Sequence, residues 1–316
     1  MTRVVLAQRR EGMAISSLLV GALFWGMLWW PLKALDGIGV AGSIVQVYAY
    51  GLAALLLLPF ALRSFAQWRD QPGLLAIIML MGGWANASLV TALTEGSVVR
   101  VMLLFFLAPV WTILAARIFL GEAFTRLRLI SLLLALAGLA ATLGGPELFS
   151  APLSVIDLLA LSSGVAFALN NVAVRVGHHL TDSVRATAMI GGCALIALGF
   201  LTFSGQPLQA LDSQQVGSML ALGLLWILPG TLVTFYGVAR LDAGRAAILL
   251  LGELVVAVIS AVLIGGEHLS WREAVGGTLL LSEAAIEART DSVAREHGQV
   301  PDHRDADQLT ELEESK

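Results

Sequence analysis

Long runs of apolar residues, separated by short polar segments, occupy most of this chain. A helix needs about 20 mostly apolar residues to cross a lipid bilayer, within a range of about 17–25. Ten runs fit this length with their flanks, although the first, fifth and tenth are near the short limit. The runs are Ile15–Trp30, Val40–Phe60, Leu74–Leu93, Val101–Leu120, Leu127–Leu143, Ile156–Val174, Ala186–Phe203, Val216–Tyr236, Ala246–Ile264 and Ala274–Ala288. The pattern predicts an all-α integral membrane protein with ten transmembrane helices.

The composition favours the same fold class. Hydrophobic residues make up 57% of the chain and charged residues 13%, about half the charged fraction of roughly 25% in soluble proteins. The alternative is a large soluble all-α protein with buried helices. Its surface helices would need a polar face, and most of the runs have none.

The two halves of the chain repeat each other. Residues 99–125 align with residues 244–270 without a gap. The matched positions are Arg100 with Arg245, Val110 with Val255, Ala116 with Ala261, Gly121 with Gly266 and Glu122 with Glu267. Five helices per copy is an odd number, so the second copy must cross the membrane in the opposite sense. The sequence therefore predicts two inverted-topology repeats of five helices each, an arrangement typical of transporters.

Basic residues give the expected orientation. Thirteen of the 19 Lys and Arg residues fall on the side of the N-terminus, three on the opposite side and three in the distal tail. Cytoplasmic loops carry the excess of basic residues, so both termini should be cytoplasmic. No cleavable signal peptide is expected, because Trp29-Trp30-Pro31 follows the first run in place of small residues.

This orientation divides the chain into five parts. We expect a cytoplasmic N-terminus at residues 1–11, a first five-helix repeat at 12–145 and an outer connecting loop at 146–153. A second repeat follows at 154–288, and an acidic cytoplasmic tail at 289–316. The tail holds eight of the 23 acidic residues and few aliphatic ones, which predicts disorder.

Short motifs in both halves of the chain resemble one known family. Trp25-Gly26 with Lys33 opens the first half, the block from Pro109 to Gly121-Glu122 closes its fourth helix, and the block from Glu253 to Gly265-Gly266-Glu267 is its counterpart. These motifs are similar to those of the drug/metabolite transporter superfamily, EamA-type branch, over about residues 12–288. The resemblance implies two EamA repeats around a central cavity and export of small metabolites such as amino acids.

Two positions depart from that family pattern. Helix nine often has Glu-Pro in the family, whereas this chain has Glu253-Leu254, so the second kink should be absent or moved to Pro229. Helix ten carries Ser282-Glu283 where the first half has Ala137-Gly138. We expect Glu283 to lie near the cytoplasmic end of its helix, where water reaches it easily.

Glu253 is the main candidate for chemistry. It lies near the middle of the ninth run with no basic residue within four positions. An isolated charge at that depth costs roughly 2.5–3.5 kcal/mol. Proton coupling or binding of a substrate amine would explain it, and so would a neutral carboxyl hydrogen-bonded between helices. Glu122 and Glu267, in contrast, lie at helix ends and are interpreted as structural.

Polar stripes at helical spacing indicate faces turned away from lipid. The third helix carries Trp84, Ser88, Thr91 and Glu95 on one face, and Trp111 lies in the fourth. The candidates for substrate binding are Trp84, Ser88 and Thr91 of this stripe, Trp25 near the mouth, and Asn170 and Asn171 of the sixth helix. Trp111 joins them because the family resemblance implies that the fourth helix approaches the central cavity. Packing between helices is the alternative for each stripe. Arg100 could pair with Glu95 or meet a substrate carboxylate, and pairing is favoured.

Helix breakers mark candidate hinges. Pro109 interrupts the fourth run, and Pro229-Gly230 interrupts the eighth. Each removes backbone hydrogen bonding and permits a bend, although an ordinary packing kink would look the same.

Several kinds of chemistry lack a signature. The chain has no Gly-rich phosphate loop, no metal-ligand spacing and no catalytic triad, so we expect neither an enzyme nor a cofactor. The prediction is a secondary transporter of the inner or plasma membrane that works by alternating access. Its partners would be a small-molecule substrate, the lipid bilayer and a candidate second copy of the chain, with no nucleic acid. A multi-spanning membrane enzyme and a non-transporting receptor or assembly protein are the alternatives.

Overall fold

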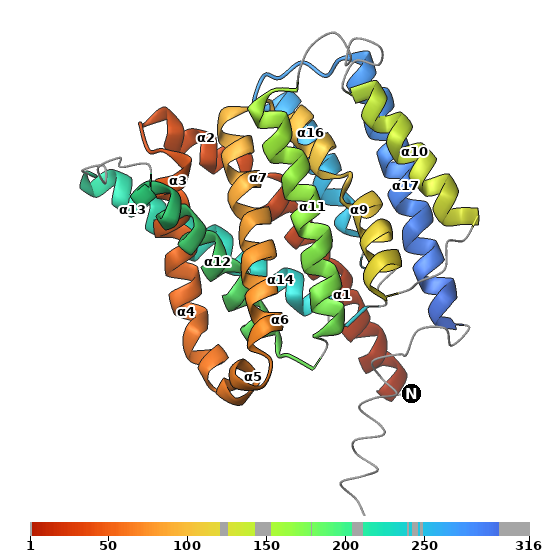
Figure 1. The fold of residues 1–316 in the computed structure, drawn as a ribbon, viewed down its shortest axis with the longest axis horizontal. Helices are drawn as coiled ribbons and strands as arrows, with labels where there is room; N and C mark the ends of the chain where they lie inside the picture. The colour runs from red at the N-terminus through yellow and green to blue at the C-terminus, as the bar shows by residue number, and fades with distance from the viewer. Residues whose placement is uncertain are drawn as a thin grey trace, which may run out of the picture.

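The computed structural model is a bundle of helices (Figure 1). It describes residues 2–120, 126–142, 153–177, 179–203, 211–238, 240–241, 246 and 249–296. Seven of the described helical stretches are long and apolar enough to cross a membrane. Two shorter apolar helices, Leu132–Thr142 and Gly252–Leu263, accompany them. The protein is thus an all-helical membrane protein, as the hydropathy pattern predicts.

The described elements fall into ten consecutive helices. Helix 1 comprises α1 (Thr2–Gly26) and α2 (Trp29–Gly37), and helix 2 comprises α3 (Gly42–Val45), the π-helical turn η1 (Gln46–Tyr50) and α4 (Gly51–Leu62). Helix 3 comprises α6 (Pro72–Ile77), the π-helical turn η2 (Ile78–Gly82) and α7 (Gly83–Glu95). Helix 4 comprises α8 (Val98–Phe105), α9 (Ala108–Ala115) and the π-helical turn η3 (Ala116–Leu120), and helix 5 is α10 (Arg126–Thr142). Helix 6 is α11 (Val155–Val176), and helix 7 is α12 (Asp182–Phe203). Helix 8 comprises α13 (Ser213–Leu222), the π-helical turn η5 (Gly223–Ile227) and α14 (Leu228–Val238). Helix 9 contains α16 (Gly252–Leu263), and helix 10 is α17 (Trp271–Glu296). A short helix, α5 (Phe65–Asp70), joins helices 2 and 3.

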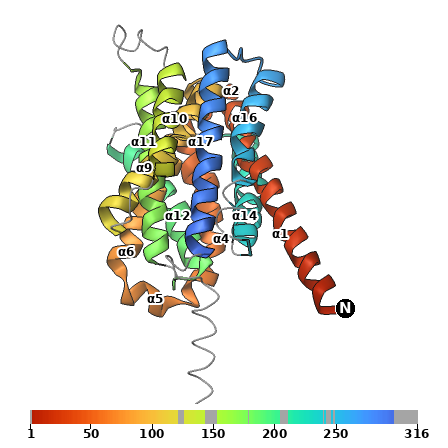
Figure 2. The same ribbon diagram turned by 90° about the vertical axis from the view of Figure 1, so that its right-hand side faces the viewer.

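The two repeats are interlocked. The most extensive packing in the bundle joins α10 to α17, α1 to α14, α4 to α12 and α7 to α11, and each of these pairs takes one helix from each repeat. Figure 1 shows α10 and α17 side by side at one edge of the bundle, and Figure 2 shows α17 from that side. Helix 1 of the first repeat corresponds to helix 6 of the second, and helix 3 corresponds to helix 8. The contact between helices 1 and 8 therefore has an equivalent in the contact between helices 6 and 3. The packing therefore has an internal two-fold relation.

Irregular turns occur at matching positions in the two repeats. The π-helical turn η2 starts at Ile78 and η5 starts at Gly223, 145 residues later, and Val110 aligns with Val255 at the same interval. Helix 4 is broken at Phe106–Leu107, and helix 9 is broken at Leu251, again 145 residues after Phe106. The duplication therefore extends to the backbone, including its departures from regular helix.

The break in helix 9 corrects one expectation. Pro109, the second residue of α9, lacks the N–H that would continue the helix from α8. Leu254 occupies the equivalent position, so the second kink was predicted to be absent or moved to Pro229. That prediction was wrong, because Leu251 interrupts the helix at the equivalent place without a proline. Pro229 adds a second irregularity next to η5.

Helix 10 also differs from expectation. The backbone of α17 continues to Glu296, eight residues into the segment predicted to be a disordered tail, and residues 297–316 lie outside the described part. Glu283 on this helix is fully buried, at 0% exposure, so the expected access to water is not observed. The tight packing of α17 against α10 covers this position.

Candidate functional site

Helix 1 is interrupted between α1 and α2, and the backbone at this interruption bonds to the second repeat. Because Leu28 N–H bonds to Trp25 O at 3.2 Å, the carbonyl of Phe24 is released from its usual helical partner. The indole of Trp226 donates to that Phe24 carbonyl at 2.7 Å. The rings of Phe24 and Trp226 also meet edge to face, with centroids 5.4 Å apart. Pro229 follows directly in α14, so the predicted hinge at Pro229-Gly230 lies against this contact.

The Trp25-Gly26 motif packs on helices 8 and 9. The Trp25 indole donates to the hydroxyl of Thr234 at 3.1 Å. A Cβ atom on Gly26 would lie 2.7 Å from the carbonyl oxygen of Glu253, so the backbones of α1 and α16 are in direct contact. Glu253 is the second residue of α16 and is half-buried. Within the described part of the chain, no hydrogen bond or ion pair reaches its carboxylate.

The polar stripe of helix 3 is engaged in packing contacts. The Trp84 indole donates to Ser162 of helix 6 at 3.2 Å, and Ser88, which is buried, donates to the Trp84 carbonyl at 2.6 Å. Thr91 accepts a hydrogen bond from Gln46 of helix 2 at 3.2 Å. Trp84 and Thr91 thus form hydrogen bonds between helices, whereas the hydrogen bond of Ser88 lies within α7.

Asn170 and Trp111 keep unused hydrogen-bonding capacity. Asn170 is 4% exposed, and its side-chain oxygen has no partner among the described residues. That oxygen faces Gly82 in the π-helical turn η2, where a Cβ atom would come within 2.8 Å of it. The buried indole nitrogen of Trp111 on α9 likewise has no described partner. Asn171 is half-buried on α11 next to Asn170.

The predicted residues therefore fall into two groups related by the internal two-fold. Trp25 and Glu253 lie where helix 1 meets helices 8 and 9. Trp84 and Asn170 lie where helix 6 meets helix 3, and helix 6 also packs on helix 4, which carries Trp111.

Sequence reasoning underestimated Glu267. Its carboxylate accepts hydrogen bonds from Val98 N–H at 2.8 Å, Val99 N–H at 3.0 Å and the Ser97 hydroxyl at 2.8 Å, and Lys33 Nζ lies 3.3 Å away. All four donors belong to the first repeat. Burial alone would raise the pKa of Glu267, but these hydrogen bonds and the Lys33 charge outweigh it and hold the pKa below its usual value. Its equivalent, Glu122, lies outside the described residues.

Arg100 has a different partner from the one predicted. Its guanidinium binds Asp157 of helix 6 in a fork, with Nε 2.6 Å from Oδ1 and Nη2 3.0 Å from Oδ2. Pairing was predicted correctly, but the partner is not Glu95. Asp157 also forms a capping box with Ser154 at the start of α11, which fixes its carboxylate for the fork.

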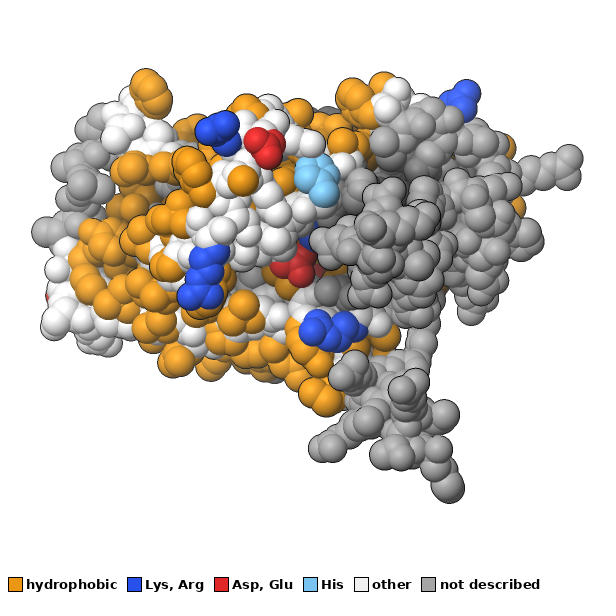
Figure 3. Space-filling view, turned by 90° about the horizontal axis from the view of Figure 1, so that it is seen from below, with side chains coloured by type: hydrophobic (Ala, Val, Ile, Leu, Met, Phe, Trp, Pro, Cys, Tyr) orange, Lys and Arg blue, Asp and Glu red, His pale blue; other side chains and the backbone are white. Residues whose placement is uncertain are grey.

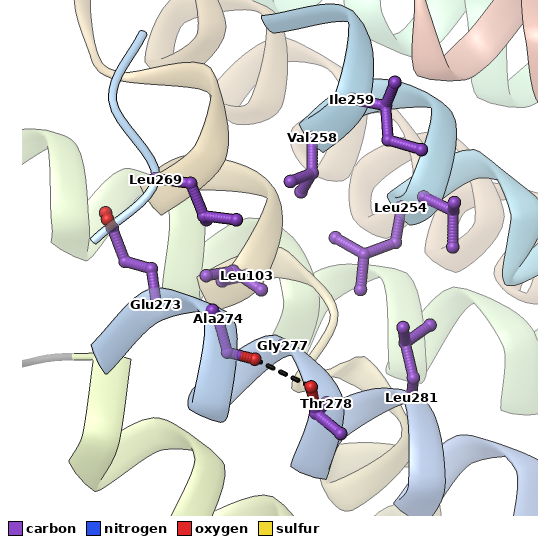
Figure 4. A pocket seen from close by; sticks show the side chains of 11 residues that line it. Leu103, Leu254, Val258, Ile259, Leu269, Glu273, Ala274, Gly277, Thr278 and Leu281 are labelled. Atoms are coloured by element: carbon purple, nitrogen blue, oxygen red, sulfur yellow. Dashed lines mark hydrogen bonds between the residues drawn. The ribbon is translucent and has the colours of Figure 1, made fainter. Parts of the chain in front are cut away.

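Two apolar grooves lie away from the predicted residues. One groove has a volume of about 230 Å³ and lies between helices 4, 9 and 10. Figure 4 shows Leu103, Val258 and Leu281 around it. The other, of about 460 Å³, lies between α2 and the start of helix 8 and is lined by Trp30 and Trp226. Neither is lined by a residue predicted to bind substrate. Among the described residues, no three His, Cys, Asp or Glu side chains gather as a metal site would require.

Comparison with known proteins identifies the repeats. The pattern of the EamA-like transporter family matches residues 12–144 and again residues 154–285. Sixteen chains of solved structures match this one. One, described only as "Crystal structure of protein", aligns with a TM-score of 0.59 and 19% identity over 88% of this chain and 97% of that chain, a likeness of fold alone. No curated protein matches the sequence. Since the two matches cover most of the chain, this protein belongs to the EamA-like transporter family, which is not a family of enzymes.

Proposed function

We propose that this transporter exports small metabolites, such as amino acids, by alternating access between its two interlocked repeats. The observation that carries the proposal is the pair of equivalent breaks at Phe106–Leu107 and Leu251. Each break starts a new helix inside the bundle, α9 on one side and α16 on the other. Discontinuous helices of this kind form substrate sites at the repeat interface in secondary transporters, where their N-termini favour negatively charged groups.

The proposed site lies between the two groups of candidate residues. Trp25 and Glu253 contribute from the α1–α16 contact, and Trp84, Ser88, Thr91, Trp111, Asn170 and Asn171 contribute from the other group. The unpartnered oxygen of Asn170 and the unpartnered indole of Trp111 favour this assignment, since buried polar groups are nearly always satisfied. Trp25, Trp84, Ser88 and Thr91 already have hydrogen-bond partners, which hold these side chains in place.

Glu253 is proposed to bind a substrate amine or to carry the coupled proton. It has no described charge partner and lies at the first turn of α16. Pro109 and Pro229-Gly230 are proposed as hinges, because each lies next to a break or a π-helical turn. No ATP site is encoded, so the substrate or proton gradient supplies the driving force.

The proposed location is the inner or plasma membrane, with both termini in the cytoplasm. Figure 3, seen from below in the frame of Figure 1, shows Lys and Arg side chains on the end of the bundle near the N-terminus, with hydrophobic side chains around the flanks. Basic residues at one end favour the cytoplasmic side there. A homodimer is a further proposal, and cross-linking in the membrane would test it.

Flux into liposomes tests the function directly. Purified protein should move labelled amino acids across the bilayer without ATP, and Glu253→Gln should lose most pH-gradient-driven uptake while substrate-driven exchange continues. Ser282→Ala serves as a control, because its hydroxyl bonds only to Thr278 of its own helix. Equal gradient-driven uptake by Glu253→Gln would remove the coupling role, and no flux across a broad metabolite panel would overturn the export proposal.

A further inference from the structure

The start of α8 forms a compact set of hydrogen-bond donors. The N–H groups of Val98 and Val99 and the hydroxyl of Ser97 converge on one point, and Lys33 of α2 adds a positive charge. Free N–H groups and the helix dipole make such a start a favourable place for an anion. The anion here is the carboxylate of Glu267, which belongs to the other repeat.

A second polar contact also ties the start of α8 to the second repeat. Arg100, three residues after Ser97, forms the forked ion pair with Asp157 of α11. Glu267 lies in the segment between α16 and α17. The first turn of α8 is therefore held by two separate elements of the opposite repeat. One of them, the segment that joins α16 to α17, lies at the end of the bundle away from the N-terminus (Figure 2).

We propose that the Glu267 carboxylate is a latch: bound to the start of α8, it holds the two repeats together at this end, and it leaves whenever the transporter opens there. The proposal rests on the alternating-access function proposed above. All the donors lie in one repeat and the acceptor in the other, so relative movement of the repeats at this end must break these bonds. A cap that only stabilised its own helix would take its donors from that helix, as Glu273 does with Ser270.

Thiol labelling measures opening without any substrate. Val98 is 0% exposed, and the chain's single cysteine, Cys193, is also buried. In a Cys193→Ala background, Val98→Cys should react slowly with a membrane-impermeant maleimide. Adding Glu267→Ala should raise the labelling rate roughly tenfold, the effect expected when charge-assisted hydrogen bonds are lost. Lys33→Met should raise it less, because the N–H groups of α8 still hold the carboxylate.

Acetate separates the latch from simple loss of packing. It should slow the labelling of Val98→Cys in the Glu267→Ala protein, since a free carboxylate can occupy the emptied donors, and should leave the wild-type rate unchanged. Glu267→Gln, which keeps the side-chain volume, should also label faster than wild type. Asp212→Ala is the matched control, because Asp212 caps its own helix through Gln215.

Each result decides the proposal. Equal labelling with and without Glu267, an equal rise in Asp212→Ala, or no effect of acetate on the Glu267→Ala protein would overturn the latch. The proposed function can fail separately: labelling that behaves as expected in a protein without flux leaves the latch standing and removes transport. If the protein transports substrate but the labelling rate of Val98→Cys does not depend on Glu267, the transport proposal stands and the latch is removed.

Discussion

At the scale of single residues, two glutamates of the second repeat differ in the partners that surround their carboxylates. Glu253 lies inside the bundle with no described partner, whereas Glu267 accepts four interactions from the opposite repeat. The sequence predicted Glu253 near the middle of an apolar run and Glu267 at a helix end. In the structure Glu253 is half-buried at the first turn of α16, and Glu267 lies between α16 and α17. It could not show that Glu267 reaches the start of α8, since Ser97 lies 170 residues away along the chain.

The lowered pKa of Glu267 predicts how its contribution depends on pH. A carboxylate whose folded pKa is depressed stabilises the protein above its unfolded pKa of about 4.3, and that stability disappears as the pH falls through the folded pKa. Glu267→Gln should therefore cost about 1.5–3 kcal/mol at neutral pH, and the cost should shrink as the pH falls below about 4.3 and Glu267 is protonated.

Thermal unfolding of both proteins from pH 8 to pH 3 checks this dependence. All other ionisable groups are common to the two proteins, so the difference between their pH profiles isolates Glu267. The comparison should be made in a His268→Gln background, which removes the adjacent imidazole. A difference that vanished between pH 8 and pH 6 would contradict the assignment.

At the scale of elements, close backbone contact between the repeats decides the packing. A Cβ atom on Gly192 of α12 would lie 2.1 Å from the carbonyl oxygen of Met79 in η2. Glycine on one helix thus lets the π-helical turn of another approach directly, a common device in membrane bundles. The sequence indicated the helices, but not the break at Leu251 or the π-helical turns, because the glycines beside them, such as Gly82 and Gly252, do not by themselves specify where a helix is interrupted.

Two glycines of the same helix test this contact. Gly192→Ala should destabilise the protein by about 1–3 kcal/mol, because backbone atoms must move to admit the methyl group. Gly199→Ala on α12 is the matched control, since nothing lies within 4 Å of its Cβ position and alanine favours a helix by roughly 0.8–1 kcal/mol. Thermal unfolding in detergent compares them. Equal behaviour of the two variants would show that helices 3 and 7 do not pack as described.

At the scale of the molecule, the two repeats form a single interlocked unit. Helix 1 packs on helices 8 and 9, and helix 6 packs on helices 3 and 4, so each repeat completes the other. The same interlocking explains why Arg100 pairs with Asp157, 57 residues away, and not with the nearby Glu95. Partner choice across repeats depends on how the whole bundle closes.

The orientation of the molecule yields a topology prediction. Reporter tags at the N- and C-terminal ends should both report the cytoplasm, and the Val98→Cys thiol should react only with reagent added outside, because an odd number of helices separates it from the N-terminus. The same measurements on permeabilised cells, where both faces of the membrane are accessible, give the control signal. Ends on opposite faces, or labelling of Val98→Cys from the cytoplasm alone, would invalidate the inverted arrangement.

The sequence by itself determined the membrane environment, the helices and the duplication, because apolar length and ungapped repetition are properties of local sequence. It also indicated Glu253, since a charge within an apolar run is visible without a structure. Only the tertiary structure decided the partners of Glu267 and Arg100, the break at Leu251 and the burial of Glu283. Those features depend on which helix of the other repeat lies alongside, and that is fixed by packing across the bundle.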